Sequence, residues 1–255
     1  MGKDGYRSPQ TGGVLDRIAP VVTLIGALLS TAGFVLAFTL AGPVNGATVN
    51  GVEVIGGEMV SNQLLFSQKI FYFHMPVAVT SMVMIGFVAY FGIRFLQTRD
   101  AAWDERARIA AGIALLFVLA TMFTGEMWER FEWGVWWTWE PRLTTYFILM
   151  LLVFAYFVLR ASFDEPERRA TFAGVYGIVM FIDVPITFAI TRIVPSSVHP
   201  TIFRTDSGLS PDMLLPLLLS LFGMLCIAYG LFRLRLRAQE LDERVEHIKE
   251  QLDEA

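Results

Sequence analysis

Five of the six tryptophans fall within twelve residues near the middle of the chain: Trp128, Trp133, Trp136, Trp137 and Trp139. If this stretch is helical, Trp133, Trp136 and Trp137 share one face, because residues three and four apart are neighbours on a helix. Indole rings gathered in this way could receive a large planar ligand or an apolar partner surface. The alternative is an interfacial aromatic belt, in which the indoles only anchor helix ends at the lipid headgroups.

Two of the three histidines could act together with this aromatic cluster. His74 lies in the segment 71–76 and His199 in the segment 194–200. Two neutral imidazoles on either side of an aromatic platform could ligate a haem iron from both faces. For each histidine alone, hydrogen-bonded packing is an equally good interpretation. The third, His247, lies among charged residues near the C-terminus and is interpreted as a solvated side chain.

Charged residues beside the tryptophans could bind an anion. A planar guanidinium suits a carboxylate such as a haem propionate, and four arginines could supply one: Arg130, Arg142, Arg192 or Arg204. An equally good interpretation is that these long basic side chains only reach the lipid headgroups from helix ends. Glu140 could orient Arg142 or contact a partner protein. Asp183 lies inside an apolar run, where an ionised acid is costly, so a hydrogen-bonded structural role is favoured over a transport role.

Composition excludes several other classes of protein. The chain is 55% hydrophobic and 17% charged, with a mean hydropathy of +0.53, which is too apolar for a water-soluble domain. A net charge of −4 argues against nucleic acid as a partner. The single cysteine, Cys226, rules out an intrachain disulfide and a cysteine-rich metal site, and it is interpreted as a small packed hydrophobe.

The elements that must position these residues are membrane-spanning helices, each needing about 20 mainly apolar residues. Six apolar stretches meet this length: 18–41, 69–94, 108–126, 142–160, 170–191 and 212–233. Long apolar runs without alternation do not fit the strands of a membrane barrel. The sequence therefore predicts an all-α polytopic membrane protein with six transmembrane helices. Its parts are a cytoplasmic N-terminus (1–17), a membrane domain (18–233) containing an external tryptophan-rich segment (126–143), and a charged cytoplasmic tail (234–255).

The distribution of lysine and arginine predicts the orientation. Six spans put both termini on one side. The segments on that side carry 15 of the 20 basic residues, against five on the other side. Both termini are therefore expected in the cytoplasm, and the tryptophans, His74 and His199 on the external face.

The sequence WGVWWTWEPRLT at residues 133–144 resembles the tryptophan-rich WWD motif of haem-handling proteins, specifically that of the CcmC (haem exporter protein C) family of cytochrome c maturation. The segment 71–82, in which His74 precedes a proline, resembles the second span of that family. The similarity runs from about residue 69 to residue 233. Where the familiar motif reads Trp-Asp-Ala-Arg, this chain has Trp139-Glu140-Pro141-Arg142, and the residues around His199 match the family less closely.

The resemblance implies that His74 and His199 are the axial ligands of haem b. It implies that the tryptophan-rich segment holds the porphyrin, and we expect four indoles to form this platform: Trp133, Trp136, Trp137 and Trp139. It further implies transfer of haem to the periplasmic chaperone CcmE, beside the CcmA/CcmB transporter and the small subunit CcmD, at the inner cell membrane. We expect Arg142 to pair with a propionate, and Glu140 to orient Arg142 or contact the chaperone. No phosphate-loop pattern is present in the sequence, and no catalytic step is assigned.

We therefore predict a haem-binding protein that presents haem at the external face of the membrane. One alternative is a haem-containing membrane oxidoreductase, or a haem-thioether synthase component of the WWD superfamily. Electron transfer through the bilayer would usually need histidines at both faces, and the synthases are typically larger. A second alternative is a structural assembly subunit that binds no cofactor.

Overall fold

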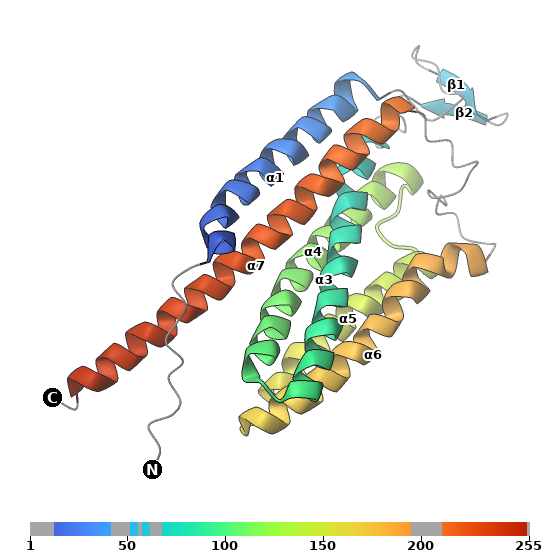
Figure 1. The fold of residues 1–255 in the computed structure, drawn as a ribbon. Helices are drawn as coiled ribbons and strands as arrows, with labels where there is room; N and C mark the ends of the chain where they lie inside the picture. Colours follow the sequence, from blue (N-terminus) through green and yellow to red (C-terminus); the bar gives the residue numbers. More distant parts are fainter. Residues whose placement is uncertain (1–12, 42–51, 56–57, 62–67, 195–210, 254–255) are drawn as a thin grey trace.

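The computed structural model describes residues 13–41, 52–55, 58–61, 68–194 and 211–253. Six long helices dominate this part of the chain (Figure 1). The elements are, in chain order, α1 (Val14–Thr39), β1 (Val52–Ile55), β2 (Glu58–Ser61), η1 (Gln68–Ile70), α3 (Phe71–Thr98), α4 (Ala101–Trp133), α5 (Pro141–Ala161), α6 (Pro166–Ile193) and α7 (Pro211–Asp253). All six helices in the described ranges are long and apolar enough to cross a membrane. The predicted all-α, six-span fold is confirmed, with a small antiparallel β1-β2 hairpin in the connection between α1 and α3.

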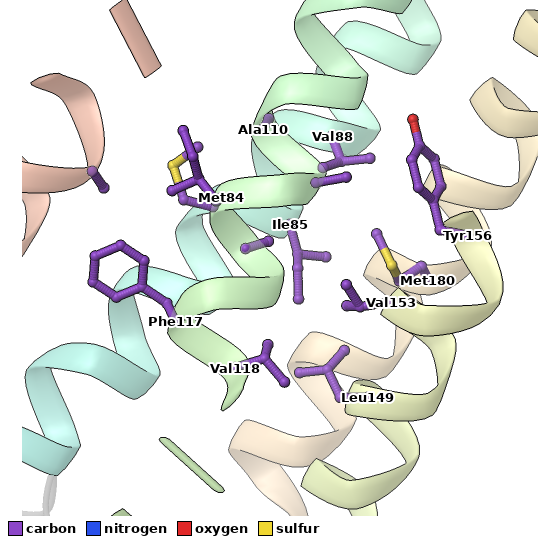
Figure 2. Close-up of a cluster of buried hydrophobic side chains, with 14 of the residues drawn as sticks. Met84, Ile85, Val88, Ala110, Phe117, Val118, Leu149, Val153, Tyr156 and Met180 are labelled. Carbon is purple, nitrogen blue, oxygen red and sulfur yellow. The ribbon is translucent and has the colours of Figure 1, made fainter. Parts of the chain in front are cut away.

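Helix α3 lies at the centre of the fold and packs against α4, α6 and α7, while α5 packs against α4 and α6. Helices α3 and α6 approach closely where two glycines meet: a Cβ added to Gly92 would lie 2.9 Å from the carbonyl oxygen of Gly174. Figure 2 shows part of the apolar core, to which α3, α4, α5, α6 and α7 contribute buried residues. Its labelled residues are Met84, Ile85, Val88, Ala110, Phe117, Val118, Leu149, Val153, Tyr156 and Met180.

An ion pair fixes α4 to α5 at the end of the bundle where α4 begins and α5 ends. The guanidinium of Arg160 donates to both carboxylate oxygens of Asp104, at 2.5 and 2.9 Å, and its side chain is only 8% exposed. Two parallel hydrogen bonds make this pair geometrically specific. Removing either partner would leave a buried charge without compensation, which is strongly destabilising.

Helices α1 and α7 form a pair along one side of the bundle (Figure 1). Small residues bring their backbones together: a Cβ added to Gly223 would lie 2.6 Å from the backbone nitrogen of Ser30 and 2.7 Å from the carbonyl oxygen of Gly26. Close contact through small residues is a common way for membrane helices to associate, because lipid gives no hydrophobic drive to bring helices together. An ion pair between Asp16 and Arg233 joins the start of α1 to the middle of α7.

The helix order fixes which ends lie together. The start of α1 and the end of α7 lie on the same side of the molecule (Figure 1), as an even number of spans requires. The other side gathers the starts of α3, α5 and α7 and the ends of α1, α4 and α6. The segments of the sequence predicted on that side carry five of the 20 basic residues, so the positive-inside rule predicts it to be the external face, and it is called the external side below.

Candidate functional site

His74 lies in the first turn of α3 on the external side, where it faces the last turns of α4. Three α4 residues surround its imidazole: Thr124, Gly125 and Trp128. The Trp128 ring meets the imidazole edge to face, with centroids 5.8 Å apart. A Cβ added to Gly125 would lie only 3.1 Å from Cε1 of His74. The glycine therefore makes room for the imidazole, and the indole limits its rotation.

The hydrogen bond between His74 and Thr124 indicates the tautomer of His74. Nδ1 of His74 lies 3.0 Å from Oγ1 of Thr124, and that hydroxyl lies 2.8 Å from the carbonyl oxygen of Ala120. A carbonyl can only accept, and a hydroxyl has one proton to donate. The Thr124 hydroxyl therefore donates to Ala120 and accepts from Nδ1–H of His74. A neutral imidazole protonated on Nδ1 carries its lone pair on Nε2, the nitrogen that a metal would bind.

Helix α4 ends at Trp133, within the tryptophan-rich segment 126–143. Gly134 closes the helix with a φ of 73°, a left-handed conformation that glycine adopts at little cost. The guanidinium of Arg130 donates to the carbonyl oxygen of Gly134 and lies over the Trp136 ring, 5.8 Å from its centroid. The predicted helical face shared by Trp133, Trp136 and Trp137 is wrong, because the helix stops at the first of the three and the chain continues as an irregular segment to α5.

This irregular segment leaves aromatic surface uncovered by protein. Trp136 is 64% exposed and Trp139 is 74% exposed. Trp137 is partly buried and makes edge-to-face contacts with Trp139 and with Phe147 of α5, each at a centroid distance of 5.7 Å. The contact with Phe147 ties the segment to the bundle, while Trp136 and Trp139 remain available to a ligand, a partner or lipid.

Glu140 and Arg142 have different surroundings at the start of α5. The carboxylate of Glu140 is nearly buried and accepts hydrogen bonds from the backbone nitrogens of Arg142 and Leu143, at 3.0 and 3.2 Å. Glu140 is thus the N-cap of α5 and fixes where the helix begins. The charge of Arg142 interacts favourably with that of Glu140 and unfavourably with that of Arg192 in the last turn of α6. Two guanidinium groups at neighbouring helix ends favour an anion between them.

Two acids in the helices have contrasting environments. Glu129, which directly follows Trp128, is only 3% exposed. Its carboxylate oxygens make no hydrogen bond within the described part of the chain. Asp183 accepts a hydrogen bond from the hydroxyl of Thr187, one turn further along α6, at 3.2 Å. The hydrogen bond agrees with the structural role predicted for Asp183.

The structure does not describe every predicted site residue. His199 lies outside the described residues, and the side chain of Trp133 is also outside them. Sequence reasoning missed Thr124 and Gly125 and gave Trp128 no separate role. The sequence signal for Thr124 and Gly125 is their spacing: they lie four and three residues before Trp128, and so on the same side of a helix. Using this signal requires knowing that α4 continues beyond residue 126.

The fold and this external end together define a class: a multi-pass helical membrane protein with a histidine and an exposed aromatic segment on one side of the bilayer. Comparison with known proteins makes this specific. The model of the CcmC family, described as heme exporter protein C, matches residues 57–251. The chain belongs to this family, and the match includes all the site residues described above.

Curated relatives agree with the family match. The heme exporter protein C of Bradyrhizobium diazoefficiens is 31% identical over 186 residues, covering 71% of this chain and 70% of the relative. The protein of that name from Haemophilus influenzae is 31% identical over 180 residues, covering 69% and 72% of the two chains. The one from Escherichia coli strain K12 is 27% identical over 169 residues, covering 66% and 69%.

Proposed function

We propose that this protein binds haem b at the external face of the cell membrane and delivers it to the haem chaperone CcmE during cytochrome c biogenesis. Its membership of the heme exporter protein C family, and the same name of its curated relatives, support the haem-handling part of this proposal. The observation that carries it is the environment of His74. Its Nδ1–H donates to Thr124, so the lone pair lies on Nε2. In most metal-ligating histidines of proteins, the ring nitrogen that does not bind the metal donates a hydrogen bond that orients the imidazole.

The indoles and the arginine supply the rest of a haem site. Trp136 and Trp139 offer exposed apolar faces to the porphyrin, and Trp137 anchors the segment to α5. Arg142 binds a propionate, and Arg192 adds a second positive charge nearby. His199 supplies the other axial ligand from the connection between α6 and α7. Haem is cargo here, and no bond-making step is needed from this chain.

Transfer to the chaperone involves the same exposed surface. Buried tryptophans frequently dominate the binding energy of protein interfaces, so a chaperone that docks on the loaded site contacts the indoles as well as the haem. The CcmA/CcmB transporter and the small subunit CcmD complete the proposed assembly in the membrane. In this arrangement His74 only binds haem, whereas the indoles both bind haem and contact the chaperone that receives it.

A paired assay on full-length variants tests this proposal. Trp136→Ala, Trp137→Ala and His74→Ala are each co-expressed with the chaperone, and haem is measured on both proteins. Porphyrin contacts are spread over a large area, so removing one indole weakens haem binding without abolishing it. We expect the tryptophan variants to retain a measurable share of haem but to load little onto the chaperone, and His74→Ala to lose both. Normal chaperone loading by the Trp136→Ala, Trp137→Ala double variant would reduce the segment to an interfacial belt.

A further inference from the structure

Helix α7 continues well beyond the membrane bundle. The ion pair between Arg233 and Asp16 lies near the start of α1, so α1 has little helix left to cover α7 past this point. Residues 234–253 continue the same helix for about 30 Å, at about 1.5 Å per residue. The first turns of this range still contact the bundle, where Arg108 of α4 donates a hydrogen bond to the side-chain oxygen of Gln239. Figure 1 shows the rest of α7 projecting away from the other helices. Neither glycine nor proline interrupts these residues.

An apolar stripe runs the length of this projection at alternating spacings of four and three residues, which is a heptad pattern. The stripe consists of Leu234, Ala238, Leu241, Val245, Ile248 and Leu252. It is uncovered: Leu241, Ile248 and Leu252 are 48%, 54% and 70% exposed. The same spacing continues the face of α7 that is buried inside the membrane, including Met213 and Leu217. The stripe therefore extends an existing helix–helix interface into the cytoplasm.

The charges beside the stripe have one predominant sign. Of the six flanking positions, four are basic, one is acidic and one is neutral, in the order Arg235, Arg237, Asp242, Arg244, Lys249 and Gln251. The opposite face of the helix carries five acids and no lysine or arginine: Glu240, Glu243, Glu246, Glu250 and Asp253. When two helices pair along such stripes, the residues that flank one stripe lie next to those that flank the other. Flanking charges therefore select a partner helix whose own flanking residues carry the opposite charge.

We propose that residues 234–253 are a docking helix for another protein, and that its occupant is a cytoplasmic helix with an apolar heptad stripe flanked by Asp and Glu. A second copy of this chain fits less well. Two copies in one membrane would be parallel, and in parallel paired helices a flanking residue lies opposite the one five positions later in the partner. Arg237 would then lie opposite Asp242, which is favourable, but Arg244 would lie opposite Lys249, which is repulsive. Lying on the lipid surface would require the uninterrupted helix to bend where it leaves the membrane.

Binding of synthetic helices to the full-length protein in neutral lipid discs tests the charge preference. The probes are two fluorescent 28-residue peptides with leucine along the stripe and either glutamate or lysine at every flanking position. We expect the glutamate peptide to bind at least about tenfold more tightly, with the difference shrinking in 1 M salt. Leu241→Asp should abolish binding, and Glu243→Gln on the opposite face should leave it unchanged. Equal affinity for the two peptides, or no effect of Leu241→Asp, would overturn the proposal.

Crosslinking in living cells tests the occupant itself. A photoreactive residue is placed in the full-length protein at Val245, on the stripe, or at Glu246, on the opposite face. The proposal requires an adduct from position 245 only, to a helix of a different protein with acidic flanking residues, and its loss after Arg244→Glu with Lys249→Glu. Adducts to a second copy of this chain, to its residues 1–12 or to lipid, or equal yields from both positions, would refute it.

Discussion

Replacing Thr124 by valine tests whether the hydrogen bond to His74 prepares the site. Valine keeps the shape of threonine but cannot accept the proton of Nδ1, 3.0 Å away. The imidazole then loses the contact that selects its tautomer. Leaving a buried donor unpaired costs about 1–3 kcal/mol, and the half-buried position of His74 puts the expected cost near the lower end. At about 1.4 kcal/mol for each tenfold change in affinity, we expect haem to bind roughly tenfold more weakly.

The assay is a haem titration of the purified protein, followed by its Soret absorbance, with Thr124→Ser as the matched control. Serine retains the hydroxyl, so its affinity should stay within about threefold of the original. Thermal unfolding of both variants checks that the fold is kept. If Thr124→Val binds haem as tightly as the unchanged protein, the hydrogen bond does not prepare His74 for ligation and the reasoning is wrong.

Three further predictions concern the glycines and the orientation. Gly125→Ala should weaken haem binding several-fold because its methyl group crowds His74, whereas Gly112→Ala, which meets no atom within 4 Å, should not; equal affinities would contradict this. Gly223→Ala should lower stability by about 1–3 kcal/mol in chemical unfolding, because α1 and α7 must separate, and an unchanged unfolding midpoint would count against the close packing. A reporter active only outside the cytoplasm should be active when fused after Trp139 and silent after Arg168; the reverse pattern would invert the topology.

The sequence alone was sufficient to predict the six spans, because the thickness of the bilayer sets the minimum length of an apolar run that crosses it. Helix ends were harder to predict. Helix α4 continues to Trp133, past the apolar run that ended near residue 126, because Gly134 rather than a change in hydropathy terminates it. The sequence showed that the tryptophans cluster, but their arrangement depends on the left-handed conformation of Gly134, which ends α4 before Trp136. The two short strands also lay beyond what a hydropathy pattern can indicate.

The surroundings of His74 could not be predicted because they depend on the register between two helices. Thr124 and Gly125 are about fifty residues away in the chain, and a shift of α4 by one residue would present other side chains to the imidazole. The pairing of α1 with α7 left a clearer signal. Small residues recur along α1 at alternating spacings of three and four: Ala19, Thr23, Gly26, Ser30, Gly33 and Ala37.

Ligation of haem iron by His74 is the central claim, and the visible spectrum of purified His74→Ala tests it most directly. The spectrum is compared with that of the unchanged protein, with and without added imidazole. We predict loss of most of the Soret absorbance in the variant and its recovery when imidazole enters the space left by the side chain. An unchanged low-spin spectrum in His74→Ala without imidazole would show that another residue holds the iron.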